Sequence, residues 1–97
     1  MIELEKIKND TYSIYVIKGT KIVHKDDGPA IVWKSGELEW YVQNKRHRVD
    51  GPAVIFPEGD VMWFLNGFKY ETKEAWFEAL DEKDKLKALY CKHFVEG

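Results

Sequence analysis

Short β-prone runs, some alternating between apolar and polar residues and some wholly apolar, recur through the first 70 positions of the chain. Such alternation predicts β-strands, because successive side chains of a strand point to opposite faces. The runs predict three hairpins, with paired strands at 2–8 and 12–17, 30–33 and 38–42, and 53–56 and 61–65. Residues typical of turns separate the two runs of each pair. We therefore expect a twisted antiparallel meander whose connections are local.

After Tyr70 the spacing of apolar residues changes to a period of about 3.6. Thr72 is a suitable N-cap for one helix, and Asp81 is a suitable N-cap for a second. One face of the second helix is expected to hold Leu86, Leu89, Tyr90 and Phe94. Because a single sheet cannot bury itself, the helices are expected to pack on one face of the meander.

The second and third hairpins belong to a sequence unit that repeats after 23 residues. Between 24–46 and 47–69, seven positions are identical: His24/His47, Asp27/Asp50, Gly28/Gly51, Pro29/Pro52, Ala30/Ala53, Gly36/Gly59 and Trp40/Trp63. We divide one domain, 1–97, into N-terminal strands with a degraded half-repeat (1–22), two repeats (23–46 and 47–70) and C-terminal helices (71–97). The expected fold is α+β and β-rich: an antiparallel β-hairpin meander of tandem 23-residue repeats with a C-terminal helical segment packed on one face.

Each repeat carries Asp-Gly-Pro-Ala between two hairpins. The Asp side chain is expected to accept hydrogen bonds from backbone N–H groups two residues on. Gly tolerates an unusual φ and the position before proline, and Pro fixes the exit into the next strand. A further glycine in each hairpin turn is expected to take a left-handed conformation. The expected turn-forming residues are Asp27, Gly28, Pro29, Asp50, Gly51, Pro52, Gly36 and Gly59.

His24 and His47 each stand three residues before an Asp, and a His–Asp pair can orient a general base. No nucleophile recurs beside them, so their repetition favours a structural role. The three histidines and Cys91 do not form a recognised zinc spacing, and no glycine-rich phosphate loop occurs. We therefore expect no catalytic residues, no metal and no cofactor, and hence no enzymatic activity.

Composition narrows the remaining possibilities. The 97 residues are 44% apolar, which argues against disorder, and the net charge of −2 excludes a globally basic nucleic-acid binder. A lone cysteine suits a reducing compartment, and no segment is typical of a signal peptide or a membrane span. These features predict a cytoplasmic protein without membrane insertion.

Two surface features are candidates for binding. Lys45, Arg46 and Arg48 form a basic junction between repeats, which fits phosphates or an acidic protein surface, or is simply a solvated connection. Tyr41, Met62 and Phe64 are expected to point away from the face of Trp63, which would make both faces of the last hairpin apolar. The second face is then covered within the monomer, by a second copy of the chain or by a partner.

The run 64–70, Phe-Leu-Asn-Gly-Phe-Lys-Tyr, and the 23-residue period resemble the MORN repeat. The Asp-Gly-Pro-Ala run departs from that pattern, and it is similar to repeats found in phage and large-virus proteins. MORN-like repeats are described as interaction or lipid-binding platforms. The resemblance therefore implies a non-enzymatic protein-binding module, a phage or viral accessory protein that binds and modulates a host protein in the host cytoplasm. A homodimer and a nucleic-acid or anionic-lipid binder using the basic junction are the alternatives.

Overall fold

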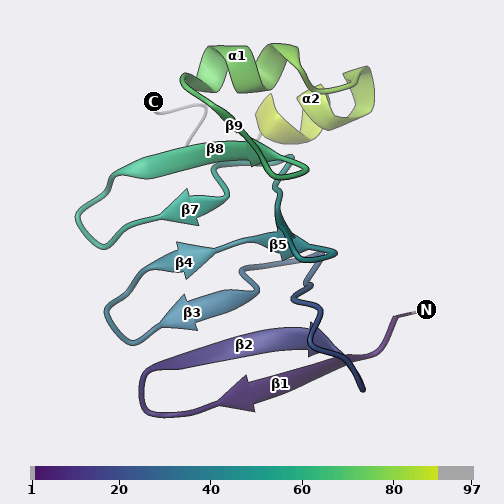
Figure 1. The fold of residues 1–97 in the computed structure, drawn as a ribbon. Helices are drawn as coiled ribbons and strands as arrows, with labels where there is room; N and C mark the ends of the chain where they lie inside the picture. The colour runs from purple at the N-terminus through teal and green to yellow at the C-terminus, as the bar shows by residue number, and fades with distance from the viewer. Residues whose placement is uncertain (1, 90–97) are drawn as a thin grey trace.

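A computed structural model of the chain describes residues 2–89. Seven strands form one antiparallel sheet in the order β1-β2-β3-β4-β7-β8-β9, with bounds Leu4–Lys8, Tyr12–Ile17, Ile31–Trp33, Leu38–Glu39, Val54–Ile55, Val61–Leu65 and Phe68–Tyr70. Strands β5 (Tyr41–Val42) and β6 (Lys45–Arg46) form a separate two-stranded sheet. Two helices follow, α1 (Lys73–Glu78) and α2 (Glu82–Leu89). The β-rich α+β class predicted from the sequence is confirmed (Figure 1).

Tight turns with specific residues join the paired strands. Gly36 and Gly59 both have a φ of 103°, and each donates its N–H to the carbonyl three residues earlier at 2.9 Å. Asn66 and Gly67 both have positive φ between β8 and β9, which is the backbone of a type I′ hairpin turn. These turns place β3 beside β4, β7 beside β8 and β8 beside β9, whereas longer segments, 18–30 and 40–53, connect β2 to β3 and β4 to β7 (Figure 1).

The single strand expected at 38–42 is wrong, because the chain leaves the main sheet at Trp40. Strand β4 ends at Glu39, and β5 begins at Tyr41 in the small sheet. The N–H of Trp40 still donates to Ala53 O at 2.7 Å, whereas its carbonyl accepts from His47 N at 3.2 Å. Trp40 is therefore held from two sides, and the strand bends there. In contrast, β8 runs unbroken through Trp63.

Apolar clusters lie on both sides of β8. Trp63 packs with Trp76, Leu80 and Ala88 of the helical segment, while Phe64 packs with Ala53 and Val54 on the opposite face. This second face was expected to be covered within the monomer, by a second copy or by a partner. In the structure, residues of the same chain cover Phe64.

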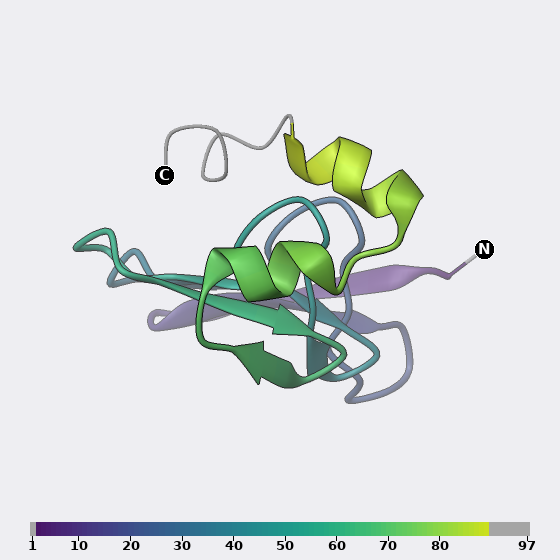
Figure 2. The same cartoon turned by 90° about the horizontal axis from the view of Figure 1, so that it is seen from above.

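The helices begin at the residues predicted to cap them. Thr72 Oγ1 accepts from Ala75 N at 3.0 Å, and Asp81 Oδ1 accepts from Asp84 N at 2.8 Å. The helices cover only the β8–β9 end of the sheet (Figures 1 and 2). Leu86 and Leu89 are exposed, while Tyr90, Cys91 and Phe94 lie outside the described residues. Within residues 2–89, neither helix is long and apolar enough to span a membrane.

Candidate functional site

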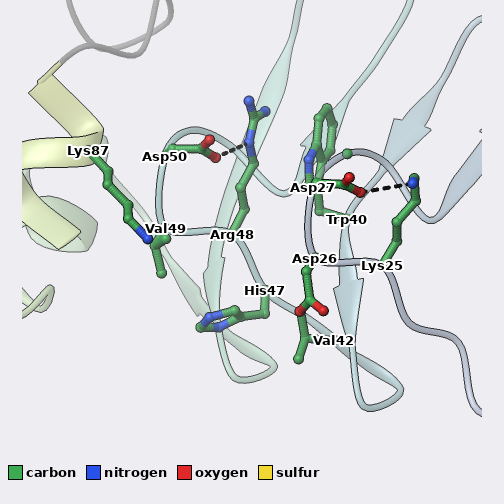
Figure 3. Close-up of a pocket in the computed structure, with 11 residues that line it drawn as sticks. Lys25, Asp26, Asp27, Trp40, Val42, His47, Arg48, Val49, Asp50 and Lys87 are labelled. Atoms are coloured by element: carbon green, nitrogen blue, oxygen red, sulfur yellow. Dashed lines mark hydrogen bonds and ion pairs between the residues drawn. The ribbon is translucent and has the colours of Figure 1, made fainter. Parts of the chain in front are cut away.

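The two Asp-Gly-Pro-Ala loops border an open hollow of about 710 Å³. Side chains from both loops line it, together with Trp40, Val42 and His47, and Lys87 reaches in from α2 toward Val49 (Figure 3). This is the place where the structure gathers the largest number of the polar residues singled out from the sequence.

The histidines of the two loops make the same contact at equivalent positions. His24 Nδ1 accepts from Gln43 N at 3.0 Å, and His47 Nδ1 accepts from Asn66 N at 2.9 Å. A ring nitrogen that accepts carries no proton, so these contacts require neutral rings with the proton on Nε2. His24 thus holds the turn between β5 and β6, and His47 holds the turn between β8 and β9. In the described part of the chain neither ring bonds to a hydroxyl or thiol.

The two rings differ in what faces Nε2. His24 Nε2 lies 3.1 Å from Asp26 Oδ2, whereas Val49 occupies the position 23 residues after Asp26. Burial lowers the pKa of His47 below its ordinary value, and the carboxylate of Asp84 opposes that shift. The ring of His47 is therefore a neutral wall of the hollow.

Each loop also holds a cation against an aromatic ring. Lys25 Nζ lies 2.9 Å from Asp27 Oδ1 and 4.4 Å from the centroid of the Tyr15 ring. Arg48 Nε lies 2.8 Å from Asp50 Oδ1, and its guanidinium lies 3.9 Å from the centroid of the Trp40 ring. The hydrogen bond from Lys25 lowers the pKa of Asp27.

These contacts differ from the expected role of the two aspartates. Their carboxylates bind the cation two residues earlier, whereas the sequence suggested backbone N–H groups two residues later. Gly28 has no positive φ; it lies beside the Lys25 side chain, 3.5 Å from Lys25 Cε to the position of an added Cβ. Gly51 and Pro52 are buried in the second loop, and Arg48 Nη1 donates to the Pro52 carbonyl at 3.0 Å.

Charges in the hollow cancel. Its basic side chains are Lys25, Arg48 and Lys87, and its acidic side chains are Asp26, Asp27 and Asp50. Lys25 and Arg48 are each paired with an aspartate. The hollow therefore offers no net positive charge to hold a phosphate.

A buried carboxylate that the sequence interpretation missed lies at the centre of the sheet. Glu39 is 4% exposed and accepts from Trp33 Nε1 at 2.6 Å, Tyr41 OH at 3.2 Å and Arg46 Nη2 at 3.0 Å. Burial favours a raised pKa for Glu39, but the hydrogen bonds from Trp33 and Arg46 hold the pKa below its ordinary value. One feature of the sequence could have indicated this buried carboxylate. Glu39 departs from the repeat, because Met62 occupies the equivalent position 23 residues later.

The residues expected to bind a partner differ in their exposure and contacts. Phe64 is 7% exposed in the core, Met62 packs beside it, and Tyr41 is half-buried. Arg46 lies between the rings of Tyr41 and Phe64, with its guanidinium 5.9 and 5.3 Å from their centroids. Arg48 is held in the hollow, and Lys45 is exposed. The structure thus brings Tyr41 and Phe64 together around Arg46, which pairs with Glu39, mainly as internal contacts.

Exposed apolar side chains lie at both ends of the sheet, and Phe68 of β9 is 63% exposed. Ile7 of β1 is 45% exposed and Val32 of β3 is 37% exposed. Three lysines, Lys6, Lys8 and Lys34, line a second hollow of about 360 Å³ together with Val32, whereas Ile7 lies on the opposite face of the sheet. Within residues 2–89, strand β1 pairs only with β2, so it forms an edge of the sheet (Figure 1).

Comparison with known proteins gives no further assignment. No family model matches the chain, and it matches no curated protein and no solved structure. Within residues 2–89, no group of three or more His, Cys, Asp or Glu residues could hold a metal ion. The resemblance to MORN repeats stays a prediction.

Proposed function

We propose that the chain is a non-enzymatic protein-binding module built from tandem 23-residue units. The observation that supports this proposal is the difference between the two ends of the sheet. The chain's own helices cover the β8–β9 end, whereas β1 is exposed along most of its length. Repeat architectures need a cap at each end, and an uncapped end is a natural surface for another polypeptide.

The covered end continues a pattern of ring contacts. Lys25 lies over Tyr15, and Arg48 lies over Trp40. At the next position in the series, Trp76 of α1 lies 4.5 Å from Trp63, centroid to centroid, and its Nε1 donates to the Arg48 carbonyl at 3.1 Å. The helix thus contributes the side chain that a further unit would supply.

Internal pairing argues against the phosphate-binding alternative. A nucleic-acid or anionic-lipid site at the basic junction needs Lys45, Arg46 and Arg48 to be available. Arg46 is bonded to Glu39 and Arg48 to Asp50, which leaves one of these three cations without a carboxylate partner in the described part of the chain. A protein partner needs no such cluster.

The similarity of the Asp-Gly-Pro-Ala run to phage and large-virus repeats supports a host protein as the partner. On this proposal the chain acts in the host cytoplasm and modulates the protein that it binds.

Affinity capture from a lysate of the natural host, followed by mass spectrometry, tests the proposal. The wild type is compared with Ile7→Glu/Val32→Glu, which places one charge on each face of the sheet near the open end. Phe68→Glu is the matched control, because Phe68 is 63% exposed at the opposite edge. Near-UV circular dichroism confirms that each variant is folded.

We expect one host protein to be captured by the wild type and by Phe68→Glu but not by the double variant. Capture that is unchanged in the folded double variant would reject the open end as the binding surface. Turnover of a small substrate by the purified chain would reject the non-enzymatic assignment.

A further inference from the structure

We propose that β1 binds an extended segment of a partner protein that carries acidic residues at alternate positions. The segment adds to the sheet as a further antiparallel strand beside β1. This inference rests on the proposed function and specifies the chemistry of the partner for the same open end.

Backbone groups of β1 alternate between the sheet and the open edge. Lys18 N donates to Glu3 O, and Asn9 N donates to Tyr12 O, both at 2.9 Å. With the antiparallel register of β1 and β2, these bonds turn the odd-numbered residues toward β2. The residues whose N–H and C=O groups point away from the sheet are therefore Leu4, Lys6 and Lys8. A strand added there gains hydrogen bonds without disturbing those already made.

Side chains of these outward-bonding residues lie together on one face, because they are two positions apart. A residue of the added strand directly opposite Lys6 or Lys8 has its side chain on the same face. No carboxylate of residues 2–89 forms an ion pair with either lysine. Acidic residues at alternate positions of the added strand would supply those partners.

The hollow beside the edge strengthens this preference for acidic side chains. Its basic residues are Lys6, Lys8 and Lys34, and its one acidic residue is Asp10. Val32 and Trp33 supply apolar surface in the same hollow. A positive hollow next to an open backbone edge fits acidic side chains on the face of Lys6 and Lys8, and the apolar side chains that alternate with them would lie on the opposite face with Ile7.

A second copy of this chain is a poor occupant of the edge. Two-fold antiparallel pairing places residues of the same face opposite each other, so a register centred on Lys6 places Lys6 opposite its own copy. A register centred on Glu5 does the same with Glu5, and like charges that are directly opposite destabilise a sheet. The lysines thus oppose self-association and favour an acidic strand.

A synthetic peptide tests the inference directly. The probe is an acetylated, amidated eight-residue peptide of alternating Val and Glu, and its comparison is the same peptide with Lys in place of Glu. Binding to the full chain is measured by fluorescence anisotropy at low and high salt. We expect the wild type to bind the Val-Glu peptide selectively, with affinity that falls as salt rises.

Two variants separate the backbone from the charges. Lys6→Pro removes an outward N–H and leaves the bonds to β2 intact, so we expect binding about tenfold weaker or worse. Lys69→Pro is the matched control at the opposite edge, because its N–H points away from β8 next to the two-residue turn. Lys6→Glu/Lys8→Glu should reverse the selectivity and bind the Val-Lys peptide instead.

The inference is wrong if the wild type does not prefer the Val-Glu peptide, or if Lys6→Pro binds it as well as the wild type does. In either case the lysines only protect the edge. Capture of the host protein that survives Lys6→Pro but is lost in Ile7→Glu/Val32→Glu would reject strand addition while keeping the proposed function. Capture that survives in both variants would reject both.

Discussion

The buried ion pair of Glu39 and Arg46 predicts substitution effects of unequal size. Glu39 is 4% exposed, whereas the Arg46 side chain is 36% exposed. Replacing Arg46 with Met removes the cation paired with a buried carboxylate, which still accepts from Trp33 and Tyr41. Breaking a fully buried pair costs roughly 3–5 kcal/mol, and the partial exposure of Arg46 reduces this, so we expect a loss of about 2–3 kcal/mol.

The reciprocal change should cost less. Glu39→Met introduces the residue that stands at the equivalent position 62, and it leaves Arg46 free to turn toward water. The main loss is the hydrogen bond from Trp33 Nε1, worth about 1 kcal/mol. The double variant Glu39→Met/Arg46→Met should therefore be about as stable as Glu39→Met and more stable than Arg46→Met.

Urea and thermal unfolding measure these differences. In a domain of this size, 1 kcal/mol corresponds to roughly 4–8 °C in Tm, so Arg46→Met should melt roughly 10–20 °C below the wild type. Equal losses for the two single variants would refute the reasoning, as would a Tm for Arg46→Met within a few degrees of the wild type.

Acid provides an independent check on the same pair. Hydrogen bonds hold the pKa of folded Glu39 below its ordinary value of 4.5, despite its burial. A carboxyl with a lowered pKa stabilises the fold above the unfolded pKa, and this contribution is lost as the pH falls through the folded pKa. The advantage of the wild type over Glu39→Met should therefore shrink below about pH 4.5. In Arg46→Met, burial raises the pKa of Glu39 with less opposition. Protonation of Glu39 at low pH then removes a buried charge, so the loss of stability relative to the wild type should be smaller in acid.

Three further predictions concern the loops, turns and helices. Because burial lowers the pKa of His47, the unfolded state takes up a proton that the folded ring resists, so stability should fall between about pH 7.5 and 5.5. The slope should be smaller in His47→Asn, and an unchanged slope would assign it to other groups. Gly59→Ala should lower the free energy of unfolding in urea by about 1 kcal/mol or more, because Gly59 has a φ of 103°. Gly28→Ala should cost less, because the φ of Gly28 is not positive. Equal costs would contradict the turn argument. Trp76→Phe removes the bond to the Arg48 carbonyl and should cost about 1–2 kcal/mol, and a Tm equal to that of the wild type would show that this bond contributes nothing.

Local features of the fold could be predicted from the sequence because a few neighbouring residues determine them. Strand β2 has the bounds expected from its alternation, and Thr72 and Asp81 accept the expected capping bonds. The break at Trp40 could not be predicted, because it depends on bonds to Ala53 and His47, which are distant in sequence.

The polar contacts of the site were harder to predict for the same reason. Glu39 sits in an alternating run that looks like an ordinary strand, and its burial depends on Trp33 of the neighbouring strand β3 and Arg46 of the separate small sheet reaching it. Phe64 was expected on a surface available to a partner, but Ala53 and Val54 cover it within the chain. Alternation predicts which residues share a face, and it does not predict what covers that face.

Residues that recur at the 23-residue period are occupied in holding the chain together. The histidines bind the turns between β5 and β6 and between β8 and β9, and the paired cations lie against aromatic rings. Groups with such internal partners have little capacity left for a ligand. Strand β1 lies outside the two clear repeats, and it exposes backbone groups at its edge, Lys6 and Lys8 on one face and Ile7 on the other. A partner-binding role is therefore expected at the part of the chain where the repeat pattern ends, and substitutions at β1 should change binding far more than they change the stability of the repeats.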